Sequence, residues 1–137
     1  LPAVCRIGRE HLEGEPEADR IAFVAGDALR DPLPGGHDLI SFKSMLHDWP
    51  DAEAGRLMDR AHDALPPGGT LLIFERAPLG GEAARRSIAT LPFLLFAPRF
   101  RSPAFYVERR RGLGVREVQV QHLALDTPFF LVAGKKA

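Results

Sequence analysis

The chain has 137 residues, of which 45% are hydrophobic and 26% charged, which is the composition of one globular domain and argues against global disorder. Its charges cancel overall, but residues 1–75 hold 14 acidic and 7 basic residues (net −7), and residues 76–137 hold 4 and 11 (net +7). The basic half contains no recognisable nucleic-acid motif, so we expect no nucleic-acid partner.

The residue types exclude several classes of protein. The single cysteine rules out an internal disulfide and a cysteine-rich zinc site. No two histidines have the spacing of a metal site, so we expect no metal. No apolar run approaches the ~20 residues of a membrane helix, and the first residues lack a basic leader. We therefore expect a cytoplasmic chain without a membrane partner.

In chain order, apolar residues at helical spacing predict a helix over 3–12, followed by a polar loop. Short apolar runs predict buried strands over 21–25 and 38–43. A clear helical periodicity then begins near Pro50 and stops at the Pro-Pro-Gly-Gly run 66–69, before a third buried strand over 70–74.

The rest of the chain is less regular. Four prolines and four phenylalanines in 78–105 predict broken helix and loop that line something apolar. The apolar runs 115–124 and 129–133 predict two strands too close in sequence for a crossover helix, and therefore an antiparallel pair at one edge. Helices alternating with strands predict an α/β fold with a mostly parallel sheet.

Polar residues follow the ends of the three buried strands. The first strand ends at Asp27, the second at Lys43 followed by His47, and the third at Glu75. Ligands of open α/β sheets bind outside the carboxyl ends of the strands. If the strands are parallel, these side chains meet at one rim, and we expect a functional site there.

Each of these residues also has a purely structural interpretation. Asp27 could begin a turn or cap a helix, and Lys43 could be a solvated strand end. His47 could pair with Asp48 at the surface, and Glu75 could pair with a surface base. The coincidence of three such strand ends favours a site over these separate interpretations.

The run 20–76 resembles the C-terminal catalytic part of S-adenosylmethionine-dependent small-molecule O-methyltransferases of the plant caffeate and bacterial polyketide type. Three blocks in a specific order, residues 23–27, 43–49 and 65–75, carry the resemblance. The most diagnostic is Lys-x-x-x-His-Asp-Trp at 43–49. The resemblance implies a partial Rossmann-like class I methyltransferase sheet that lacks its first strands, with residues 1–137 as the C-terminal portion of the catalytic domain.

The resemblance also implies roles for the strand-end residues. S-adenosylmethionine would be the cofactor, with Asp27 at its adenine amino group, Gly26 and Ala28 beside it and Lys43 against it. The acceptor would be a hydroxyl of an aromatic or polyketide-like small molecule.

Two residues would then form the catalytic pair. His47 resembles the general base of the family, and Glu75 resembles one of the acids that flank and orient that base. The implied oligomer is a homodimer, or another self-associated state, because a sheet cut before its central strand leaves an open edge.

The sequence departs from the family in three respects. A Gly-x-Gly-x-Gly loop and an N-terminal dimerisation domain are absent from these residues, and the second acid that flanks the base has no match. Glu108 is the nearest acid, in the wrong register. The chain alone therefore need not be competent, and a non-catalytic fragment and a relative that performs another reaction, such as hydroxylation, are open alternatives. A nicotinamide dehydrogenase is disfavoured because the dinucleotide fingerprint is absent.

Overall fold

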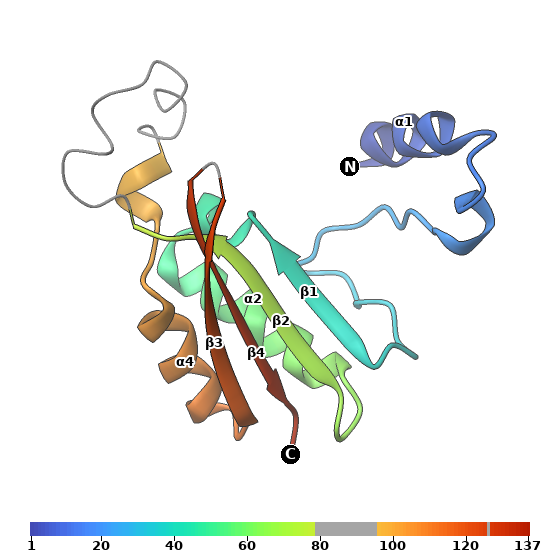
Figure 1. Ribbon diagram of the computed structural model, residues 1–137. Helices are drawn as coiled ribbons and strands as arrows, with labels where there is room; N and C mark the ends of the chain where they lie inside the picture. Colours follow the sequence, from blue (N-terminus) through green and yellow to red (C-terminus); the bar gives the residue numbers. More distant parts are fainter. Residues whose placement is uncertain (79–95, 126) are drawn as a thin grey trace. The chain divides into compact units, whose positions relative to one another are not determined.

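The computed structural model describes residues 1–78, 96–125 and 127–137, which form two compact units, Leu1–Pro32 and Leu33–Ala137 (Figure 1). Each unit is described by itself. Among the described residues, no helix is both long and apolar enough to cross a lipid bilayer.

The N-terminal unit is built on the helix α1, Pro2–Leu12, which confirms the helix predicted there, and on the short 3-10 helix Ala18–Arg20. A proline in the first turn suits the start of a helix, where its missing N–H is not needed. Phe23 packs closely on α1, since a Cβ atom at Gly8 would lie 2.6 Å from its ring. Arg9 donates a hydrogen bond to the carbonyl oxygen of Phe23 at 3.1 Å.

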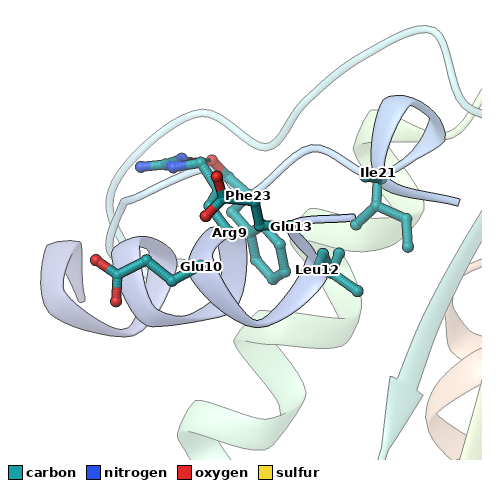
Figure 2. Close-up of a pocket in the computed structure, with 7 residues that line it drawn as sticks. Arg9, Glu10, Leu12, Glu13, Ile21 and Phe23 are labelled. Carbon is teal, nitrogen blue, oxygen red and sulfur yellow. Dashed lines mark hydrogen bonds between the residues drawn. The ribbon is translucent and has the colours of Figure 1, made fainter. Parts of the chain in front are cut away.

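The predicted strand over 21–25 is wrong for this structure, because these residues form no regular element. A strand needs a neighbour to satisfy its backbone groups, and none of the described strands pairs with this segment. Ile21 and Val24 are exposed, while Phe23 lies along α1. This segment and α1 line an open hollow of about 300 Å³. Figure 2 shows Leu12, Ile21 and Phe23 among the side chains that line it.

The C-terminal unit is a four-stranded sheet in the order β1-β2-β4-β3, with β1 Leu39–Lys43, β2 Thr70–Arg76, β3 Arg116–Ala124 and β4 Pro128–Lys135. The β1 and β2 strands are parallel, and β4 is antiparallel to both β2 and β3. This confirms the α/β class and the antiparallel C-terminal pair. The prediction of a mostly parallel sheet depended on residues 21–25 as a further strand. Because these residues form no strand, the described sheet has one parallel pairing, β1 with β2, and two antiparallel pairings.

One face of the sheet is buried under two helices (Figure 1). Helix α2, Asp51–Ala64, buries Ala61 against Leu71 of β2, and helix α4, Pro103–Gly112, places the Tyr106 ring 5.7 Å from Phe130 of β4. Side chains alternate between the two faces of a strand, so Leu71, Ile73 and residue 75 of β2 all point to this covered face.

Helix α4 and the 3-10 helix Ala97–Arg99 lie where the sequence indicated broken helix, loop and an unassigned stretch. Pro103 begins α4 rather than interrupting a helix, which is the position where proline is tolerated best. The basic run at its end looks solvated in sequence, yet Arg110 is fully buried and donates to the carbonyl oxygen of Leu71. Residues 79–95 of the irregular stretch, including Phe93, lie outside the described residues.

Candidate active site

The carboxyl ends of β1 and β2 lie side by side, as the strand-end argument predicts. Lys43 pairs in register with Phe74, the residue before Glu75. The amide of Ser44 donates to the carbonyl oxygen of Phe74 at 2.8 Å, which extends the pairing by one residue. Ser44 has a φ of +48°, in the left-handed region, and there the chain leaves the strand and turns into the next element. Lys43 is exposed at this rim.

Glu75 is a buried carboxylate with three contacts to one turn of the chain. It is 1% exposed because it continues the core-facing row of β2. Its Oε1 atom accepts hydrogen bonds from the backbone amides of Met45 at 3.0 Å and Leu46 at 2.7 Å. Its Oε2 atom lies 2.7 Å from Nδ1 of His47. Charge-assisted hydrogen bonds of this kind offset the loss of hydration of a buried charge. The alternative interpretation of Glu75, as a surface residue paired with a basic side chain, is therefore wrong.

His47 sits in the 3-10 helix Leu46–Asp48 and is 8% exposed, so it is not a surface residue either. A carboxylate can only accept hydrogen bonds, so Nδ1 of His47 carries the proton that faces Glu75. In the neutral ring, Nε2 then holds a lone pair on the opposite side. The half-exposed carboxylate of Asp48 lies 3.5 Å from Nε2.

Two aromatic side chains meet the imidazole edge-on. The ring centroid of Phe100 lies 5.1 Å from that of His47, and the ring centroid of Phe96 lies 6.0 Å away. Phe100 is buried, whereas Phe96 is exposed. His47 therefore lies against an apolar wall. Phe105, another phenylalanine of the irregular stretch, packs instead against Tyr106.

Two arginines that the sequence did not single out contact the same turn. Arg101 donates to the carbonyl oxygens of Leu46 at 2.9 Å and Trp49 at 2.6 Å, and to the carboxylate of Asp51 at 2.8 Å. Arg99 donates to a further carbonyl oxygen of the turn at 3.1 Å. Motif matching cannot find such residues, because their partners are backbone atoms about fifty positions away in the sequence.

Tyr106 of α4 lies under the site and is fully buried. Burial raises the pKa of Tyr106 to about 12, and the negative charge of Glu75 adds to the shift, while Arg101 opposes it. The phenol is thus neutral across the physiological range.

The remaining predicted site residues lie in the N-terminal unit, where residues 26–31 form a hydrogen-bonded turn. The Oδ1 atom of Asp27 accepts from the amide of Leu29 at 2.9 Å, and the amide of Asp27 donates to Asp31 at 2.8 Å. A Cβ atom at Gly26 would come within 3.2 Å of that Asp31 carboxylate, which favours glycine there. The local hydrogen bonds of Asp27 are therefore those of a turn residue, as its structural interpretation expects. Its side chain remains 48% exposed, and Ala28 follows it on the same turn.

Two other predictions concern acids and metals. Glu108 lies on α4 beside Arg109, Gly112 and Leu113, where these residues line a separate hollow. Within residues 1–78, 96–125 and 127–137, no cluster of three or more histidine, cysteine, aspartate or glutamate side chains could hold a metal ion.

Comparison with known proteins gives a consistent result. A family model described as an O-methyltransferase domain matches residues 1–97. The 3-hydroxy-5-methyl-1-naphthoate 3-O-methyltransferase of Streptomyces sahachiroi is 31% identical over 140 residues, which cover 100% of this chain and 41% of that protein.

Solved structures agree in fold. An O-methyltransferase family 2 protein from Planctomyces limnophilus, in complex with apigenin, is 29% identical with a TM-score of 0.73, over 99% of this chain and 41% of that one. Human N-acetylserotonin methyltransferase, in complex with S-adenosylmethionine, is 26% identical with a TM-score of 0.73, over 100% of this chain and 39% of that one. The chain thus spans about two fifths of the length of these relatives.

Proposed function

The chain belongs to the O-methyltransferase domain family, and from that premise we propose that it forms part of an enzyme that methylates a hydroxyl group of an aromatic small molecule. The observation that supports this proposal most strongly is the 2.7 Å contact between Glu75 and His47 at the carboxyl end of the parallel strands. A buried carboxylate that fixes one nitrogen of an imidazole leaves the other nitrogen as a base of defined direction.

His47 is the proposed general base. A phenol is a much weaker acid than an imidazolium, so full proton transfer before reaction would be uphill. The proton therefore moves to Nε2 of His47 as the hydroxyl oxygen reacts. Glu75 stabilises the imidazolium that forms, because its Oε2 atom accepts from Nδ1.

The residues of the rim and of the 26–31 turn fit S-adenosylmethionine by their chemistry. The half-exposed carboxylate of Asp27 can accept a hydrogen bond from an adenine amino group, and Gly26 and Ala28 offer little bulk beside it. Lys43 adds an exposed ammonium group at the end of β1. When bound, S-adenosylmethionine supplies a methyl group on a positively charged sulfur. The solved human relative holds this cofactor.

The acceptor is proposed to be a flat aromatic hydroxyl compound of the polyketide kind. Phe96 and Phe100 present their edges to His47, which suits an aromatic ring beside the base. The names of the relatives point the same way, since one methylates a hydroxynaphthoate and another was solved with apigenin.

Methyl transfer from radiolabelled S-adenosylmethionine to a panel of hydroxynaphthoates and flavones tests the proposal. His47→Asn should abolish transfer, whereas the matched change His122→Asn, at an exposed histidine of β3, should leave it unchanged. Transfer that survives in His47→Asn contradicts the role of the base. Cofactor binding without transfer to any acceptor supports the alternative of a non-catalytic fragment.

A further inference from the structure

The turn that contains His47 is held at both ends by charged side chains. Glu75 accepts hydrogen bonds from two backbone amides at its beginning. Arg101 donates to the carbonyl oxygens of Leu46 and Trp49, which flank His47 and Asp48 in the sequence. A negative group at the amide end and a positive group at the carbonyl end match the dipole of the turn.

The guanidinium of Arg101 is well suited to this position. Its side chain is 8% exposed, and its three donors reach three different acceptors. Burial alone would lower the pKa of Arg101, but the hydrogen bond to the Asp51 carboxylate and the charge of that group raise it above the ordinary value. The group therefore stays charged. A lysine in its place has one nitrogen and cannot span the same acceptors.

The two residues that precede Arg101 in the chain reach the same turn. Arg99 donates to the carbonyl oxygen of Asp48, and the ring of Phe100 lies at 86° to the imidazole of His47. The segment 99–101 thus contacts the backbone that carries the base and also the ring itself. Any shift of Arg101 would move both contacts.

We propose that Arg101 is a positioning residue for the reaction, which sets the direction of the His47 ring by holding the carbonyl oxygens of Leu46 and Trp49. The inference rests on the proposed role of His47 as the base. Without Arg101, the carbonyl oxygen of Trp49 loses this donor, and that of Leu46 keeps only its hydrogen bond from the Trp49 amide at 3.2 Å. The turn can then rotate the imidazole away from Glu75. Misplacement by about 1 Å can cost on the order of 100-fold in rate.

The experiment compares Arg101→Met and Arg101→Lys with Arg109→Met in the 137-residue chain. Arg109 is a matched control because it is an arginine of the same basic stretch that joins α4 to α2 through Asp59. Asp51→Asn is a second control that removes the exposed ion pair and keeps both carbonyl bonds of Arg101.

The principal readout is the ¹⁵N chemical shifts of the His47 ring, which report the tautomer and need no methyl transfer. We expect the Nδ1–H form in the wild type and both controls, a mixture in Arg101→Met and an intermediate in Arg101→Lys. Acrylamide quenching of Trp49, the only tryptophan, should rise in the same order. Where transfer is measured, kcat should fall about 10- to 100-fold with KM for the methyl donor unchanged.

An unchanged His47 tautomer in Arg101→Met overturns the inference, as does an equal change in Arg109→Met. If Arg101→Met does not fold, the lysine variant decides, because it retains the charge but has a single donor nitrogen. Failure of the proposed function would give a different result. In that case the ¹⁵N shifts of the His47 ring would still change in Arg101→Met, but His47→Asn would leave methyl transfer intact.

Discussion

Glu75 and His47 are 28 positions apart in the sequence, yet the Oε2 atom of one lies 2.7 Å from the Nδ1 atom of the other. Two parts of the fold bring them together. Glu75 is the last inward-facing residue of β2, and His47 follows the end of the parallel neighbour β1 after a turn at Ser44. The contact is thus a product of the sheet register, and it orients the proposed base.

Glu75→Gln should reverse the tautomer of His47. A glutamine can still accept from the amides of Met45 and Leu46, but its NH₂ group then faces Nδ1 and turns that nitrogen into an acceptor. The free energy of unfolding should fall by about 1–3 kcal/mol, and methyl transfer should be lost. Urea denaturation and ¹⁵N shifts of the ring check both effects. The control is Glu53→Gln, which alters a surface pair with Arg56, and an unchanged tautomer in Glu75→Gln would refute the prediction.

The buried phenol of Tyr106 should destabilise the fold at alkaline pH. Its pKa is about 12 in the folded chain against about 10 in an unfolded one, so the folded state retains the proton longer. The stability it contributes is complete below pH 10 and is lost as the pH rises towards 12. At pH 11 the loss relative to neutral pH should be about 1 kcal/mol, because this pH lies about one unit above the pKa of the unfolded chain and below that of the folded one.

Tyr106 is the only tyrosine, so absorbance at 295 nm follows its ionisation without interference from another phenol. The midpoint should lie near 12 in the native chain and near 10 in urea. Tyr106→Phe should show no loss of stability from this source between pH 8 and 11. A native midpoint near 10 would show that the phenol is not buried beside Glu75.

The chain should self-associate through the outer edge of β1. Within the described sheet β1 is an end strand, and its Leu39 side chain is 50% exposed. Open strand edges template pairing with another chain, and a lysine placed there discourages it. Light scattering should therefore show dimers or larger species that Leu39→Lys diminishes. Leu125→Lys, at an exposed leucine away from this edge, is the control. A monomer at high concentration would contradict the prediction.

The order of strands and polar residues predicts that His47 and Glu75 lie together, because one general rule places both residues. The carboxyl ends of parallel strands share a rim, and this rule brings Lys43, His47 and Glu75 to one end of the β1–β2 pair. The orientation of Glu75 also follows from the sequence, since residues 71, 73 and 75 alternate onto the same face.

Other features lie beyond sequence reasoning for physical reasons. The apolar run 21–25 has the composition of a strand, but a strand also requires a partner, and here Phe23 packs on a helix instead. Arg101 and Arg110 look like solvated charges in a basic stretch. Each instead extends a buried guanidinium to backbone carbonyl oxygens that only the tertiary fold brings near.

The most direct test of the account is a calorimetric titration of S-adenosylhomocysteine into the 137-residue chain, with Asp27→Ala as the variant and Asp19→Ala as the control. We expect micromolar binding that Asp27→Ala abolishes and Asp19→Ala preserves, because Asp27 is the proposed acceptor for the adenine amino group. Absence of binding by the folded chain, or equal binding by the Asp27→Ala variant, would contradict the assignment of the cofactor site to these residues.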